Sequence, residues 1–364
     1  MPASAARFFA KVYSPTGATY RQTIDSGLFL SAPKIVREVG KPAGTVDLAL
    51  GLPWDDFGYG SATGINRFDL VKVYAVNRAN RDGLLVYQGH VTEIVAKLGG
   101  AADGVTLKLF SLDALLGLAF FKNGASFTKS YAAADVDTMF SDVISHVNSV
   151  QGATFFTGSL GNPGLSITAD FVELTHLAAL QRAASFLDSA TWRWRINASG
   201  VISLAQWADA TADHKLAVGR DVLEIEVRNS IAEIKNGFRL GWGGTPTYAY
   251  YEDATSKTSF GVREYKKVDS NIGDSGSADS FGDGEIARQK DAKFSTRITV
   301  SPEYAIETIL PGDTVTVGNL TTASTQMLSG VKRIVRTEYD GAICVLHLDD
   351  PVRLFGTEMA KALS

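Results

Sequence analysis

FDLVKV at residues 68–73 and GDTVTV at residues 312–317 are two versions of one strand pattern, in which an Asp leads an alternating run. Each is followed by a strand containing a Gly, VYQGHVTEI at 86–94 and MLSGVKRI at 327–334. An Asp-Gly turn then opens a third strand, DGVTLKL at 103–109 and DGAICVLHL at 340–348. Such patterns occur in antiparallel sheets in general, so chance similarity is the competing explanation. The matched order of three elements, with the Gly in the same place, favours a duplicated β-domain.

The composition is that of a soluble globular protein with two or three domains, at 364 residues, 45% hydrophobic and 20% charged. A formal net charge of −4 argues against stable nucleic-acid binding, which needs a basic face. The single cysteine, Cys344, rules out an intramolecular disulfide, and we expect it to be a small buried hydrophobe. Residues 1–9 lack a signal peptide's apolar core and no run has the length of a membrane span, so we expect folding in a bacterial-type cytoplasm.

The periodicity predicts a mainly β fold with an α+β insert, in which two related antiparallel β-barrel-like domains flank a small helical and hairpin domain. We expect these domains at residues 1–116, 117–220 and 221–364. Strands are predicted in the first domain at 7–13 and 45–50.

In the insert, apolar residues at helical spacing predict a helix that is capped by Asp135 and ends at Gln151-Gly152. A second helix is expected to begin with Asp170 as its cap. The hairpin at 192–204 is predicted to turn its tryptophans toward these helices and its arginines toward solvent or a partner subunit. In the last domain, the polar stretch 269–285 is predicted to be a mobile loop leading into a short helix at 285–294.

Motifs for catalysis are weak. Gly273-Asp274-Ser275-Gly276-Ser277 resembles the nucleophile loop of trypsin-like serine proteases, but the sequence offers no matching histidine pattern. The acids of residues 269–285 do not follow calcium-loop spacing, the five histidines show no zinc spacing, and no phosphate-binding Gly-rich loop is present. We therefore predict no catalytic, cofactor-binding or metal-binding residues and no enzymatic activity.

The order of the elements resembles the tail-hub family of tailed phages and related contractile injection systems. The similar segments are Ser256 to Glu264, Trp192-Arg193-Trp194, Gly200-Val201-Ile202, Ile309 to Val315 and Gly330 to Ile334. The resemblance implies a homotrimeric baseplate-hub ring in the virion tail, in which two barrels per subunit offer a nearly sixfold face. Some relatives carry a C-terminal hydrolase or fibre-binding extension, and since this sequence ends at Ser364 we expect none here.

The partners that the resemblance implies are other copies of the chain, the tail tube or distal tail protein, the tape measure protein, and a tail fibre or tip protein. DNA would pass through the ring, which would assemble in the cytoplasm of the bacterial host. Two alternatives remain: a β-rich hydrolase or carbohydrate-binding protein, suggested by Ser275 and exposed aromatics, and a hexameric tail-tube or distal tail subunit.

Overall fold

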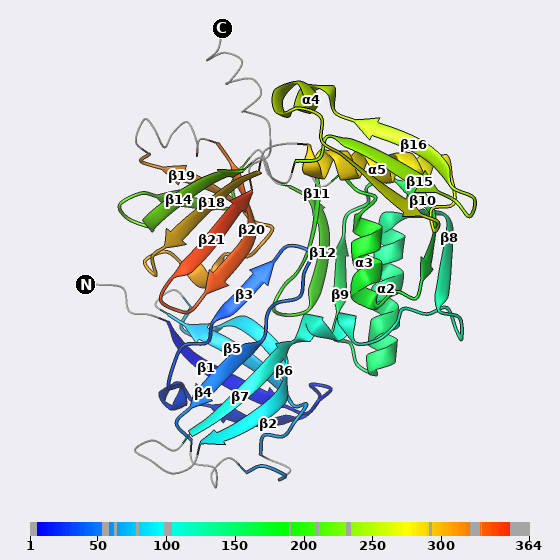
Figure 1. The fold of residues 1–364 in the computed structure, drawn as a ribbon. Helices are drawn as coiled ribbons and strands as arrows, with labels where there is room; N and C mark the ends of the chain where they lie inside the picture. The colour runs from blue at the N-terminus through cyan, green and yellow to red at the C-terminus, as the bar shows by residue number, and fades with distance from the viewer. Residues whose placement is uncertain are drawn as a thin grey trace.

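Two curved sheets stand one above the other, and two helices with a smaller sheet lie beside them (Figure 1). A computed structural model of the protein describes residues 6–52, 58–61, 64–77, 80–97, 104–188, 191–207, 211–230, 234–290, 293–320, 328 and 330–349. Asp103, Met327 and Ser329 of the repeated pattern lie outside these residues. The predicted mainly β fold with an α+β insert is confirmed.

The first sheet has six strands in the order β2-β1-β5-β6-β7-β4, and all neighbours are antiparallel. Its strands are β1 (Arg7–Tyr13), β2 (Tyr20–Ile24), β4 (Val46–Leu50), β5 (Leu70–Val76), β6 (Leu84–Lys97) and β7 (Gly104–Ser111). Two short 3-10 helices, η1 (Ser26–Leu28) and η2 (Leu112–Gly117), flank it. Along β7 every second residue is buried, because successive side chains of a strand point to opposite faces. The predicted strands at 7–13 and 45–50 are confirmed.

The second sheet runs in the order β13-β19-β20-β21-β18-β14. It contains β13 (His214–Ala217), β14 (Val222–Ser230), β18 (Lys293–Val300), β19 (Thr314–Gly318), β20 (Lys332–Tyr339) and β21 (Cys344–Asp349), with η3 (Ile306–Thr308) between β18 and β19. A seventh strand, β3 (Ile35–Glu38), comes from the N-terminal part of the chain and pairs antiparallel with β20. Cys344 is fully buried in β21 as predicted, and burial raises the pKa of its thiol to about 12.

One hydrophobic core joins the two sheets. Residues of both, such as Leu48 and Leu107 in the first and Ile298 and Leu346 in the second, belong to a single buried cluster. β3, which comes from the N-terminal part of the chain, pairs with β20 at the side of the second sheet nearer the first (Figure 1), and its Ile35 belongs to the same core. The two β units therefore form one continuous body.

The insert is built from β8 (Thr128–Asp135), α2 (Val136–Gln151), β9 (Thr157–Leu160), β10 (Ser166–Val172), α3 (His176–Ala184), β11 (Trp192–Ile196) and β12 (Val201–Gln206). The predicted apolar stripe of α2 is wholly buried, and Gly152 ends the helix in the left-handed conformation. Asp170 is not a helix cap, because it lies in β10, paired with Ser130 of β8. The cap of α3 is Thr175, whose hydroxyl accepts a hydrogen bond from the backbone N–H of Ala178.

A further three-stranded sheet follows, in the order β16-β15-β17. Its elements are β15 (Gly237–Trp242), β16 (Thr247–Glu252), α4 (Ala254–Phe260), β17 (Glu264–Asp269) and α5 (Ser275–Gln289). The predicted mobile loop at 269–285 is wrong, since most of it forms α5. The Asp274 carboxylate caps this helix by accepting hydrogen bonds from the backbone N–H and hydroxyl of Ser277. Small residues then let α5 approach the sheet closely: a Cβ at Gly282 would lie 2.4 Å from the Tyr251 ring.

A second core fills the insert and extends into this small sheet. Phe140 of α2 and Leu180 of α3 belong to the same buried cluster as Phe238 of β15 and Phe281 of α5. Residues 234–290, which the sequence assigns to the last domain, thus pack with the insert. The boundaries 1–116, 117–220 and 221–364 stay a prediction.

Candidate functional site

Ser275 does not stand in a protease-like nucleophile loop. It is exposed at the first position of α5, and the preceding Asp274 is occupied with capping that helix through Ser277. Within the described residues, no group of three or more His, Cys, Asp or Glu side chains could hold a metal ion. The described helices include none that is long and apolar enough to cross a membrane.

Two histidines that are 30 residues apart meet in the insert. The Nδ1 atom of His146 lies 2.7 Å from Nε2 of His176, and the ring of Phe121 packs edge-on against His146. Burial, with the neighbouring His146, lowers the pKa of His176 to about 4, so both rings are neutral at pH 7 and one donates to the other. Only the tertiary packing of α2 and α3 creates this pair, which sequence spacing gave no means to find.

The clearest repeated geometry lies at the two Asp residues that lead the repeated strands. The Oδ2 atom of Asp69 accepts the backbone N–H of Asn66 at 2.8 Å, and Oδ2 of Asp313 accepts that of Leu310 at 2.9 Å. The backbone N–H of each Asp also donates back to the carbonyl of the same residue, Asn66 for Asp69 and Leu310 for Asp313. Each Asp therefore closes the same tight turn before its strand.

The residues before these two Asp residues share an unusual backbone. Phe68 has φ +68° and Gly312 has φ +90°, both in the left-handed region. The N–H of Phe68 donates to Val91 and that of Gly312 to Ile334, each at 2.7 Å. The backbone N–H of Val91 in turn donates to the carbonyl of Asp69, and that of Ile334 to the carbonyl of Asp313. For Phe68 this conformation is strained, and its half-exposed ring stacks on His90 with centroids 4.7 Å apart.

The match continues through four strands. Both middle strands bulge one residue after the shared position, since the register shifts between Val91 and Glu93 in β6 and between Ile334 and Arg336 in β20. Val91 faces Leu109 of β7, and Ile334 faces Leu348 of β21. The fourth strands also correspond, because β4 pairs with β7 as β18 pairs with β21. The two repeats are thus β4-β5-β6-β7 and β18-β19-β20-β21, in the same chain order and the same spatial order.

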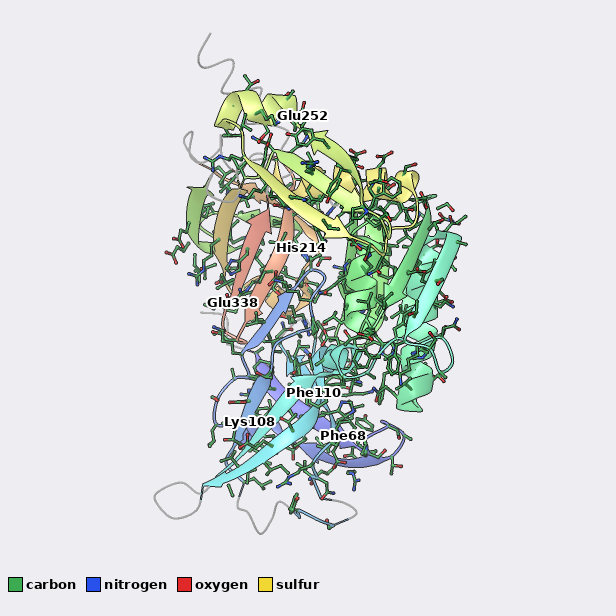
Figure 2. The ribbon with its side chains drawn as sticks, turned by 45° about the vertical axis from the view of Figure 1, so that its right-hand side comes forward. Phe68, Lys108, Phe110, His214, Glu252 and Glu338 are labelled. Atoms are coloured by element: carbon green, nitrogen blue, oxygen red, sulfur yellow. The ribbon has the colours of Figure 1, made fainter. Side chains whose placement is uncertain are left out.

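One detail of the predicted repeat is wrong. The hydrogen-bond match aligns Gly89 with Lys332, so the glycines of the two middle strands do not coincide. Gly89 does not break β6; it is needed because a Cβ there would lie 2.2 Å from the carbonyl oxygen of Phe110. Gly330 instead precedes β20 with φ +80°. Figure 2 shows Phe68 and Phe110 close together on the lower sheet, next to the close approach of Gly89 to Phe110.

The charged partners of the two Asp residues differ. Asp69 pairs with Arg21 of β2 at 3.2 Å, whereas Asp313 pairs with Arg195 of β11 at 2.5 Å and with His214 at 3.1 Å. Burial raises the pKa of Asp69. Burial also acts on Asp313, but the His214 hydrogen bond and the Arg195 charge outweigh it and hold the pKa of Asp313 below its usual value.

The hairpin arginines were predicted to face solvent or a partner subunit, but both also make contacts within the chain. Arg195 reaches the second β unit through Asp313, and the guanidinium of Arg193 lies 5.1 Å from the ring centre of Trp207. The tryptophans do face the helices: Trp194 is buried and packs edge-on against Phe140 of α2. The hairpin fixes the insert to the second sheet.

The insert carries several exposed apolar side chains. Leu118, Phe120, Phe127 and Val172, here called the insert patch, are 65%, 45%, 42% and 36% exposed. The two Phe rings pack edge to face with centroids 5.5 Å apart, and the carbonyl of Phe127 accepts the N–H of the residue after Val172. Exposed large apolar side chains that lie together, as Phe120 and Phe127 do, are typical of interaction surfaces.

Comparison with known proteins gives a consistent result for the fold. No protein-family model and no curated protein matches the sequence. Among solved structures, the chain is similar to the 43 kDa tail protein of prophage MuSo2 from Shewanella oneidensis, with 15% identity, a TM-score of 0.64 and coverage of 95% of this chain and 99% of that one. A tail protein from Neisseria meningitidis gives 14% identity, a TM-score of 0.65 and coverage of 95% and 97%.

The chain also resembles, more distantly, a protein of a bacterial secretion system. A component of the type VI secretion system of E. coli shares 10% identity with the chain, at a TM-score of 0.51 and coverage of 90% of this chain and 74% of that one. The resemblance predicted from the sequence is thus confirmed at the level of the fold. This chain has the fold that phage tail proteins share with that type VI secretion component.

Proposed function

We propose that the protein is a structural hub at the distal end of a phage tail, where three copies form a ring that adapts a sixfold tail tube or distal tail protein to a threefold tip, spike or fibre. The observation that carries this proposal is the pair of four-stranded repeats in one chain. Three chains with two repeats each offer six nearly equivalent units.

The shared core supports this role mechanically. Because residues of both repeats share one buried core, and β3 from the N-terminal part of the chain pairs with β20, their relative placement is fixed within each chain. A ring then needs only one further kind of contact, a heterologous one between the second repeat of one chain and the first repeat of the next. A stable contact of this kind buries on the order of 800 Å² per partner.

The proposed partners follow from the symmetry. The tail tube or distal tail protein would bind the face made of six repeats, the tape measure protein would end at the ring, and a fibre or tip protein would bind the threefold side. The net charge of −4 suits a conduit that lets DNA pass without holding it. The assembled protein would reside in the virion tail after assembly in the host cytoplasm.

A structural role also fits the surroundings of Ser275. A serine nucleophile needs a histidine base oriented by a carboxylate, but the neighbouring carboxylate of Asp274 is engaged with Ser277 at the start of α5. We therefore propose that the protein is not an enzyme.

Light scattering on the purified protein tests the oligomeric state, and electron microscopy of the particle tests the symmetry. We expect three subunits per particle and a ring with six similar lobes. A hexamer would favour a tail-tube or distal tail subunit instead. A monomer at high concentration that fails to assemble with tail-tube protein would refute the proposal.

A further inference from the structure

The middle strands of the two repeats, β6 and β20, differ in the strand pairing of their C-terminal halves. In β20, residues from Arg336 to Tyr339 have β21 on one side and β3 on the other. The corresponding half of β6, from Glu93 to Lys97, pairs with β7 on one side. On its other side β5 ends at Leu70, opposite His90, and within the described residues no strand pairs with β6 beyond that point.

The hydrogen bonds of β3 show which groups this open edge presents. The backbone N–H of Val39 donates to the carbonyl of Val335 at 2.9 Å, just beyond the Arg336–Glu38 pair. Because backbone groups of a strand alternate between its two sides, Thr337 and Tyr339 also face β3. Their counterparts in β6, matched through Val91 and Ile334, are Ile94 and Ala96, and Thr92 matches Val335.

The surroundings of this edge resemble those of its filled counterpart. Ile35 of β3 is buried in the first core, opposite Tyr339, while Lys34 pairs with Glu338 at 3.2 Å on the outer side. Figure 2 shows Glu338 beside β3. At the open edge, Ile94 packs partly against the same core, and the exposed Glu93 pairs with Lys108 at 2.8 Å. A strand added here would likewise have one apolar and one polar face.

The filled edge also shows where the missing strand comes from. The second repeat receives β3 from the part of the chain that carries the first repeat. In a ring of alternating repeats, the unit next to the open side of a first repeat is the second repeat of another copy. We propose that the open edge of β6 at Thr92, Ile94 and Ala96 is the subunit junction, where an extended segment of a second copy of this chain adds a strand. This inference rests on the proposed ring.

Such strand addition uses main-chain hydrogen bonds for affinity, and a row of unpaired N–H and C=O groups is suited to it. Proline at Ala96 removes one of these N–H donors. The bonds to β7 come from the alternate residues Glu93 and Val95, so the change spares that ladder, and proline is tolerated where a strand's N–H faces outward. Ala96→Val is the matched control, because it enlarges the side chain but keeps the N–H.

Light scattering on the full chain tests the junction. We expect wild type and Ala96→Val to be trimers and Ala96→Pro to lose the trimer while its circular dichroism stays that of the wild type. A trimeric Ala96→Pro would overturn the junction and leave the proposed ring standing, whereas a monomeric wild type would overturn both. Amide hydrogen exchange on the wild type gives a second test that needs no variant. The N–H groups of Ile94 and Ala96 should exchange more slowly in the trimer than in diluted monomer, and equal rates would also overturn the junction.

Discussion

Replacing Asp313 by Asn should destabilise the protein by about 2 kcal/mol. The change removes the charge that holds Arg195 at 2.5 Å and His214 at 3.1 Å, but its amide oxygen can still accept the N–H of Leu310. Hydrogen bonds to charged groups contribute about 1.5–3 kcal/mol, and breaking a fully buried pair costs about 3–5 kcal/mol. The Arg195 side chain is 26% exposed, so solvent screening places the expected loss near the lower range.

A double-mutant cycle with Arg195→Met separates the pair from the individual losses. Unfolding in urea, followed by tryptophan fluorescence, gives the free energy of unfolding of the wild type, both single variants and the double variant. We expect a coupling of about 1–2 kcal/mol between Arg195 and Asp313. Asp47→Asn on the exposed side of β4 serves as a control and should change stability by less than about 0.5 kcal/mol. A coupling below about 0.5 kcal/mol would show that the hairpin is not fixed to the second sheet by this pair.

Three more predictions concern local features. The loss of unfolding free energy caused by Asp313→Asn should shrink between pH 7 and pH 3. The pKa of Asp313 is lowered in the folded state, so its carboxylate stabilises the protein above the unfolded pKa, and this stabilisation is lost as the pH falls through the folded pKa. A loss that stays constant with pH would contradict this. Thr175→Ala should lower the free energy of unfolding in urea by about 1 kcal/mol, because it removes the cap of α3, and Asp170→Ala should lower it by less than about 0.5 kcal/mol. The reverse order would restore Asp170 as the cap. Gly282→Ala should lower the thermal midpoint, because its clash with Tyr251 costs about 1–3 kcal/mol, more than the roughly 1 kcal/mol gained in helix propensity. Gly276→Ala, at an exposed position of the same helix, should not lower it. Equal midpoints for the two variants would argue against close packing of α5.

Local patterns predicted the elements whose cause is local. The α2 stripe, the β11–β12 hairpin and most strands of both repeats follow from periodicity and turn residues. The pattern failed for α5, because Ser, Gly and Asp favour loops until a cap and a closely packed partner, here Tyr251, select the helix. It also gave no hint of β3, a strand of four residues whose partner β20 lies about 300 residues further along the chain. The His146–His176 pair was missed for the same reason.

The differences between the repeats carry as much information as their likeness. Beside the matched strands, β1 runs antiparallel to β5, whereas β13 runs parallel to β19, so the flanks of the two repeats are not equivalent. A partner with sixfold symmetry can make six equivalent contacts only with what both repeats share, which is the four matched strands.

The insert patch, by contrast, occurs once in each chain, on an element that lies to one side of both sheets (Figure 1). Three copies of it would be related by a threefold axis alone, so in the proposed ring the patch matches the symmetry of a threefold partner. In the proposed ring, the duplicated strands would thus serve the sixfold contact and the insert the threefold contact. If that division is correct, replacing Phe120 and Phe127 by Ser should weaken binding of the tip or fibre protein in a pull-down and leave tube binding intact, and loss of both would contradict it.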